Sequence, residues 1–159
     1  MTPETIKKRK SVIVGLYSSI VLALLALPSV YIHEIGHLII CAADGSEFTL
    51  DINVFGGTLY CHVKPVNGTL FLAFGGIFAM MVLSVPLAWK KISRTAFISI
   101  PLLSLVIGHG INSIIETFLA QWYLQNQIIT IVLLNTLVAA SFFALFYFVV
   151  IKKERVEKH

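Results

Sequence analysis

The sequence predicts an all-α membrane protein with about four transmembrane helices and a small β-hairpin between the first and the second. Of its 159 residues, 57% are hydrophobic and only 13% are charged, and the mean hydropathy is +0.88. A water-soluble domain of this composition would have too few polar side chains to cover its surface. We therefore expect residues 1–159 to form a single integral membrane domain in contact with a lipid bilayer.

Four apolar segments are long enough to cross a hydrocarbon core of about 30 Å. They cover, approximately, residues 11–43, 69–89, 96–123 and 128–151. At a rise of about 1.5 Å per residue, the first would be roughly 50 Å long as a straight helix. We expect it to kink near Pro28, which lacks an amide hydrogen and whose ring clashes with the preceding turn.

The basic residues are distributed unevenly around these spans. Eleven of the twelve lysines and arginines precede the first span, separate the second from the third, or follow the fourth, and Lys64 alone lies elsewhere. The positive-inside rule then places both termini in the cytoplasm of a multi-pass protein of the cell membrane. No basic stripe with interleaved aromatics is present, so we expect no nucleic-acid partner. A cleaved signal peptide is the alternative for the N-terminus, although the segment lacks a clear A-x-A site.

Residues 47–63, between the first two spans, have the pattern of a β-hairpin. Hydrophobic side chains occupy alternate positions: Phe48, Leu50, Ile52 and Val54. Gly56 and Gly57 then offer a tight turn, and the sequence TLYCHV resumes the extended pattern. The open edge of this hairpin could accept another extended chain, or the hairpin could serve packing alone.

The first span contains the sequence HEIGH, with His33, Glu34 and His37. On a helix the two histidines project from one face about one turn apart, so both imidazoles can bind one metal ion. Zinc in such a site lowers the pKa of its bound water to about 7, and the adjacent glutamate can take the proton. Ionisable side chains inside a span need partners, which favours this interpretation over polar residues that merely satisfy one another between helices.

A catalytic zinc site usually has three protein ligands and one open position. Glu116 is the only carboxylate between Asp51 and the C-terminal tail. It lies almost as far beyond the basic residues that precede its span as His33 does, so the two side chains should sit at similar depth. Glu116 is therefore the expected third ligand for zinc. The alternatives are His109 and then Asp51, Asn112 and Cys41.

Asn112 shares a helical face with Glu116 and precedes it by one turn. Its amide could hydrogen-bond the substrate carbonyl or the developing oxyanion, which makes it a candidate catalytic residue beside Glu34. A plain hydrogen bond between helices is the alternative role. Gly75 and Gly76, in the second span, would let that helix approach another backbone closely or would merely pack.

Cys41 and Cys61 both fall on the predicted outward side. Three states are open for them. They could form a disulfide in an oxidising compartment, Cys41 could offer a thiolate to the metal one turn beyond His37, or both could remain free thiols.

Taken together, these residues resemble the site-2 protease family of intramembrane zinc metalloproteases, especially its compact prokaryotic members. The resemblance covers roughly residues 30–120: HEIGH late in an apolar span, a glycine-containing hairpin, the small-residue helix AFGGIFAMM, and a polar helix. It implies that His33 and His37 bind zinc and that Glu34 is the general base. The family commonly supplies its downstream ligand from an aspartate in a "DG" turn, and the sequence NSIIE stands there in this chain.

The expected function is therefore hydrolysis of a peptide bond in or next to a transmembrane segment of a membrane-protein substrate. Two alternatives remain open: a non-proteolytic membrane scaffold or chaperone with the same fold, and a metal-transporting or metal-sensing helical bundle. The spans contain few other polar residues to continue an ion path, and a scaffold would not need Glu34.

Overall fold

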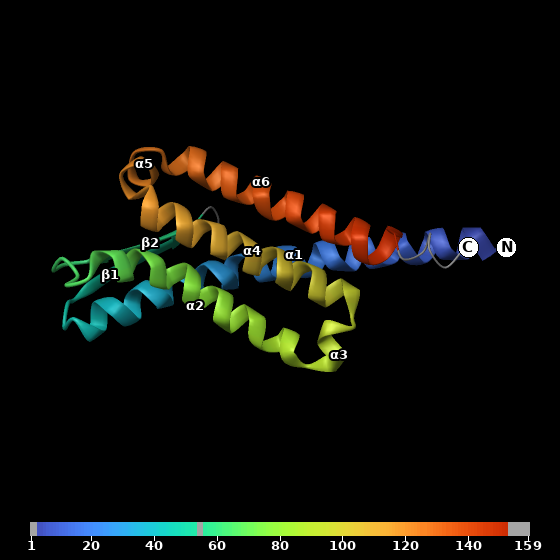
Figure 1. Ribbon diagram of the computed structural model, residues 1–159, viewed down its shortest axis with the longest axis horizontal. Helices are drawn as coiled ribbons and strands as arrows, with labels where there is room; N and C mark the ends of the chain where they lie inside the picture. The colour runs from blue at the N-terminus through green and yellow to red at the C-terminus, as the bar shows by residue number, and fades with distance from the viewer. Residues whose placement is uncertain (1–2, 54–55, 153–159) are drawn as a thin grey trace.

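A computed structural model describes residues 3–53 and 56–152 (Figure 1). Four of its helices are long and apolar enough to cross a membrane, which confirms the predicted fold class. The elements in chain order are α1 (Pro3–Ala43), β1 (Phe48–Asn53), β2 (Gly56–Cys61), α2 (Gly68–Ala88), α3 (Lys90–Ser93), α4 (Ala96–Phe118), α5 (Ala120–Gln125), α6 (Gln127–Phe146) and the π-helical turn η1 (Tyr147–Lys152).

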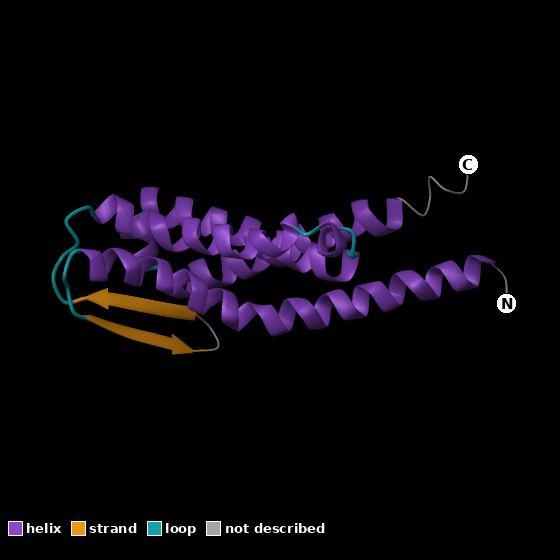
Figure 2. Cartoon of the chain, turned by 90° about the horizontal axis from the view of Figure 1, so that it is seen from below, coloured by secondary structure: helices purple, strands orange, loops and turns teal. Residues whose placement is uncertain are grey.

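Helix α1 continues without interruption through Pro28, over 41 residues. At about 1.5 Å per residue it is roughly 60 Å long, and Figure 2 shows that it curves along its length. The Ser29 hydroxyl donates a hydrogen bond to the Ala26 carbonyl at 2.7 Å next to the proline. The chain therefore accommodates Pro28 inside the helix and does not break there.

Helix α4 occupies the centre of the bundle, because α1, α2 and α6 all pack against it. Helix α2 also packs along α1, and α6 lies on the side of α4 away from α2 (Figure 1). Near α3, a cluster of buried leucines joins α2 to α4: Leu83, Leu102 and Leu105. Helices α1 and α4 are thus held by a shared neighbour, α2.

The hairpin pairs β1 with β2 in antiparallel register, with Leu50 opposite Leu59. The structure corrects one detail of the sequence prediction. Gly56 and Gly57 are not the turn, because they pair with Asn53 and Ile52 inside the ladder. The connection falls on residues 54–55, which lie outside the described residues, as does the predicted alternation at Val54.

The third span is shorter than the predicted 96–123. Helix α4 ends at Phe118, because Leu119 leaves helical geometry with φ −122° and ψ 29°. Helix α5 then forms a separate short segment between the ends of α4 and α6 (Figure 1). The boundary places α5 beside the end of α4 that carries Glu116.

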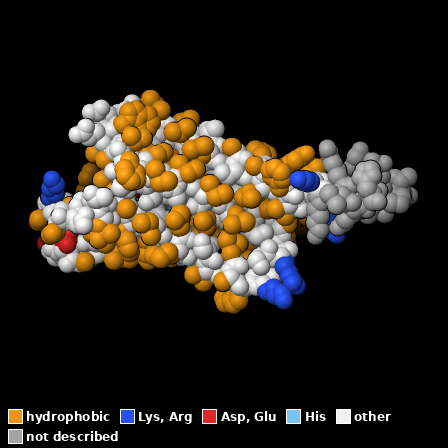
Figure 3. Space-filling model, in the orientation of Figure 1, with side chains coloured by type: hydrophobic (Ala, Val, Ile, Leu, Met, Phe, Trp, Pro, Cys, Tyr) orange, Lys and Arg blue, Asp and Glu red, His pale blue; other side chains and the backbone are white. Residues whose placement is uncertain are grey.

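The surface of the bundle is apolar along its middle and charged near its ends (Figure 3). Large side chains such as Leu24 and Phe143 are 69% and 67% exposed, as lipid-facing residues are. Lys90 and Lys91 lie at the α3 end, whereas Lys64 belongs to the loop that follows the hairpin. This distribution suits a bilayer around the four long helices.

Candidate metal centre

His33 and His37 on α1 face Glu116 on α4 across the helix interface. The Nε2 atoms of the two imidazoles lie 3.1 Å apart. Oε2 of Glu116 lies 3.2 Å from Nε2 of His33 and 3.5 Å from Nε2 of His37. Among the described residues, these three buried side chains form a group that could hold a metal ion.

The spacing of these three atoms fits a tetrahedral zinc site. Zinc binds histidine nitrogen and carboxylate oxygen at about 2.0–2.2 Å, and ligands at tetrahedral angles are then about 3.3–3.5 Å apart. The three measured separations of 3.1, 3.2 and 3.5 Å are close to this value. Two imidazoles and a carboxylate are also a donor set that zinc favours. The residues therefore fit the metal that the sequence predicts.

The orientation of His37 is fixed by a backbone group of α2. Its Nδ1 donates a hydrogen bond to the Phe71 carbonyl at 2.7 Å. With the proton on Nδ1, the lone pair of Nε2 is free to bind a metal, and partners of this kind commonly orient histidine ligands. Such a carbonyl partner has no signature in the sequence.

His109 lies behind His33 and outside the group of ligand atoms. Its Nδ1 is 3.2 Å from Nδ1 of His33, the ring nitrogen on the opposite side from the Glu116 carboxylate. The two rings are stacked with their centroids 5.3 Å apart. His109 is thus placed to accept a hydrogen bond from Nδ1 of His33. Such a bond would fix the orientation of the His33 ring, as partners of histidine ligands commonly do.

Asn112 contacts both the carboxylate of Glu116 and the imidazole of His33. Its Nδ2 donates to Oε1 of Glu116 at 3.1 Å and lies 3.3 Å from Nε2 of His33. This hydrogen bond holds Glu116 so that Oε2 points toward the imidazoles. Oδ1 of Asn112 is buried without a hydrogen-bond partner among the described residues. The proposed catalytic role of Asn112 remains a prediction.

Glu34 lies under strand β2. The backbone N–H of Leu59 donates a hydrogen bond to its carboxylate. A Cβ atom on Gly57 would come within 2.6 Å of Cγ of Glu34, so only glycine lets the strand approach this closely. Glu34 is 5% exposed, about as buried as His33 and His37 at 3% and 6%. The hairpin therefore covers the predicted general base.

The glycine pair of α2 brings three helices together at the site. A Cβ atom on Gly75 would collide with the imidazole of His37, and one on Gly76 would collide with the backbone and side chains of α4. A Cβ atom on Gly36 of α1 would likewise collide with the backbone of α2 at Gly75. The predicted close approach is confirmed, and it is made against the ligand helix itself.

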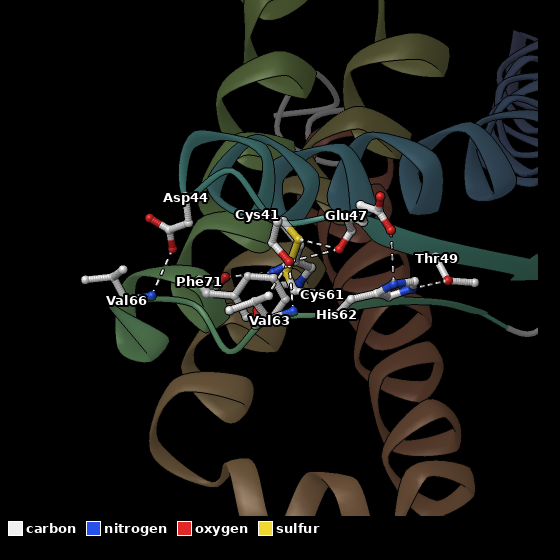
Figure 4. The surroundings of a disulfide bond; sticks show 11 residues. Cys41, Asp44, Glu47, Thr49, Cys61, His62, Val63, Val66 and Phe71 are labelled. Carbon is white, nitrogen blue, oxygen red and sulfur yellow. Dashed lines mark hydrogen bonds and ion pairs between the residues drawn. A yellow bond between two sulfur atoms is a disulfide. The ribbon is translucent and has the colours of Figure 1, made fainter.

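A disulfide between Cys41 and Cys61 joins the last turn of α1 to the end of β2 (Figure 4). Hydrogen bonds nearby hold the same region, including one from the Val66 N–H to the Asp44 carboxylate at 2.9 Å. Cys41 is therefore not a metal ligand. Asp51, another alternative, is exposed on β1 and pairs with Thr58.

A cavity of about 740 Å³ opens beside these residues. Its walls come from α1, α4, α6 and β2, and they include His33, Glu34, Asn112 and Glu116. Most of the remaining lining is apolar, such as Leu27 of α1 and Phe142 of α6. The candidate metal centre therefore borders this cavity with buried side chains.

Tyr123, on α5, is a residue of this cavity that the sequence did not single out. It lines the cavity with Glu34 and Glu116. Burial and the nearby Glu116 charge raise the pKa of Tyr123, so the phenol keeps its proton. Its position in the sequence could have pointed to it, because Tyr123 is the next titratable residue after Glu116 in the chain.

Comparison of the chain with protein-family models, with curated proteins and with solved structures finds no match.

Proposed function

We propose that this protein is an intramembrane zinc metalloprotease, which hydrolyses a peptide bond in or next to a transmembrane segment. The observation that supports this most is the tetrahedral spacing of the His33, His37 and Glu116 ligand atoms, with Glu34 in the same cavity. The resemblance of HEIGH and the segments around it to site-2 proteases points the same way. The proposed third ligand, Glu116, differs from the aspartate that this family commonly supplies.

In this proposal the protein side chains divide the work of hydrolysis. His33, His37 and Glu116 would hold zinc, which would supply Lewis acidity by lowering the pKa of a bound water to about 7 and polarising the substrate carbonyl. Glu34 takes a proton from the attacking water as the new C–O bond forms. It then delivers that proton to the amide nitrogen as the C–N bond breaks. The products are a carboxylic acid, which keeps the second proton of the water, and an amine; proton exchange at neutral pH leaves them as a carboxylate and an ammonium group.

The cavity suits a substrate that enters from the bilayer. Its apolar walls on α1 and α6 match a membrane segment, and its polar groups are concentrated at the metal centre. The backbone of His62 bonds Glu47 across the hairpin at 2.9 Å, so by alternation Leu59 and Gly57 turn their backbone groups away from β1. The Leu59 N–H bonds Glu34, and the remaining backbone groups on this edge of β2 could pair with a locally unwound substrate strand.

We further propose that both termini are cytoplasmic, in the cell membrane. The basic residues of the α3 end and of the two terminal segments support this orientation. The metal centre and the hairpin would then lie toward the outer side of the membrane, where water and an oxidising environment are available.

The test replaces Glu34 by glutamine in the full chain, reconstituted in liposomes with zinc and a set of transmembrane peptides. We expect peptide cleavage to fall by about 10²- to 10⁴-fold, because the general base is removed, while bound zinc stays constant. Glu47→Gln is the matched control, because that side chain is 90% exposed at the hairpin.

Undiminished cleavage by Glu34→Gln would contradict the proposal. Zinc uptake into the liposomes by the wild type, unaffected by Glu34→Gln and without any cleavage, would instead identify a metal-transporting bundle. Absence of both activities, with a folded and metal-free wild-type chain, would favour the scaffold.

A further inference from the structure

The short helix α5 brings a phenol into the metal centre from outside the ligand helices. After α4 ends, the Tyr123 N–H donates a hydrogen bond to the Leu119 carbonyl at 2.8 Å, which sets the first turn of α5. The neighbouring side chains Trp122 and Leu124 are 39% and 64% exposed, whereas Tyr123 is only partly exposed and lines the cavity. Helix α5 thus turns one polar aromatic group inward.

The two carboxylate oxygens of Glu116, which lines the same cavity as Tyr123, already face other polar groups. Oε1 of Glu116 accepts a hydrogen bond from Asn112, and Oε2 faces the two imidazoles. The Asn112 amide nitrogen, the donor first considered for a substrate oxyanion, is therefore engaged by Glu116. Tyr123 lines the same cavity as Glu34 and Glu116. It is a neutral donor at the edge of the ligand set.

Hydrolysis of an amide needs such a donor at one point in the reaction. When the oxygen of water bonds to the carbonyl carbon, the π electrons of the carbonyl move onto its oxygen, which becomes an oxyanion. A preorganised neutral donor stabilises this charge more than it stabilises the ground-state carbonyl, and it therefore accelerates the step. A phenol with an ordinary pKa near 10 keeps its proton at neutral pH and can fill this role.

We propose that Tyr123 is a catalytic residue, whose hydroxyl hydrogen-bonds the substrate carbonyl oxygen as the oxyanion forms. No proton is transferred from the tyrosine. The hydrogen bond is made as the tetrahedral carbon forms and is released when the C–N bond breaks and the carbonyl returns. This assignment rests on the proposed peptide hydrolysis, and it deepens that proposal by replacing Asn112 with Tyr123 as the oxyanion donor.

The test compares Tyr123→Phe with Tyr31→Phe in the zinc-loaded full chain. Tyr31 is the matched control, because it lies on α1 two residues before His33 and is 45% exposed. The first readout is binding of a phosphinic peptide, whose tetrahedral phosphorus oxygens mimic the oxyanion, by calorimetry. The second is zinc affinity by chelator competition, and the third is kcat and KM for a cleaved transmembrane peptide.

We expect Tyr123→Phe to weaken the phosphinic peptide and to lower kcat by about 10²-fold, the effect of losing one oxyanion donor. Zinc affinity and KM should stay at the wild-type values, and Tyr31→Phe should change nothing. A loss of zinc affinity of about 10- to 100-fold would overturn the assignment, because it would make Tyr123 a residue that positions Glu116.

The outcomes also separate this inference from the proposed function. If the wild type binds the phosphinic peptide and Tyr123→Phe binds it equally well, the Tyr123 assignment is wrong and the protease proposal stands. If the zinc-loaded wild type binds no phosphinic peptide and cleaves no substrate, both proposals are wrong.

Discussion

The two ends of the helical bundle are held together by different kinds of contact. At the α3 end, Leu83, Leu102 and Leu105 form a buried cluster surrounded by other leucines, isoleucines and two valines. At the hairpin end, α1, α2 and α4 meet through glycines, imidazoles and a carboxylate, and a disulfide joins α1 to β2. Flexible aliphatic side chains can repack around a change, whereas the hairpin end has little such freedom.

The difference shows which end of the bundle tolerates the least change in side-chain size. Gly75 has the ring of His37 directly against it, and Gly57 has the side chain of Glu34 against it. At these positions one added carbon meets a group of the metal centre. At the leucine cluster, an altered side chain meets only other hydrocarbon. Substitutions at the two ends should therefore separate in one common assay, the affinity for zinc measured by chelator competition.

The largest effect is expected for Glu116→Ala. Removing one of the three proposed ligands should weaken zinc binding by more than about 100-fold, beyond the range typical of residues that only orient a ligand. Glu47→Ala, which removes an exposed carboxylate, should leave zinc affinity unchanged. The ligand set would be wrong if Glu116→Ala kept its zinc while His109→Ala lost it.

A smaller effect is expected for Gly75→Ala. The added methyl group would have to displace the His37 imidazole or the whole of α2, and such overpacking costs about 1–3 kcal/mol. We expect zinc affinity to fall roughly tenfold, since a shift of about 1.4 kcal/mol at a ligand corresponds to that factor.

Gly68→Ala serves as the control for this substitution. It lies at the start of the same helix, and a Cβ atom there meets nothing within 4 Å. Equal zinc affinity of the two alanine variants would contradict the close contact between α2 and His37.

The smallest effect on zinc is expected for Leu102→Ala at the opposite end. This residue is 4% exposed in the leucine cluster, and truncation of a buried leucine costs about 2–5 kcal/mol of stability. We expect a lower thermal unfolding temperature in detergent with no change in zinc affinity. A loss of zinc as large as that of Gly75→Ala would show that the two ends are coupled.

Only some residues of the candidate site at the hairpin end can be predicted from the sequence. The four-residue spacing of His33 and His37 places them on one helical face whatever the surroundings. Glu116 follows by elimination, because few carboxylates occur in this chain. Both predictions use rules of a single helix or of composition, and the structure brings the three side chains together as expected.

The remaining parts of the site depend on contacts between elements. The carbonyl of Phe71 is a ligand partner only because α2 approaches α1 along its glycine face. Gly57 resembles a turn residue in the sequence, yet it lies in β2. A glycine is needed there because the Glu34 side chain leaves no room for a Cβ atom. Tyr123 enters the site because α4 ends earlier than its apolar pattern does. Local periodicity carries no information on these three points.

The bond between Cys41 and Cys61 also makes a covalent ring of the segment between them, which includes both strands. A single backbone cut inside this ring would leave the cover over Glu34 attached to its helix. The two fragments of such a nicked chain would migrate together on a non-reducing denaturing gel and would part only after reduction. The disulfide thereby keeps the hairpin attached to α1 after such a cut.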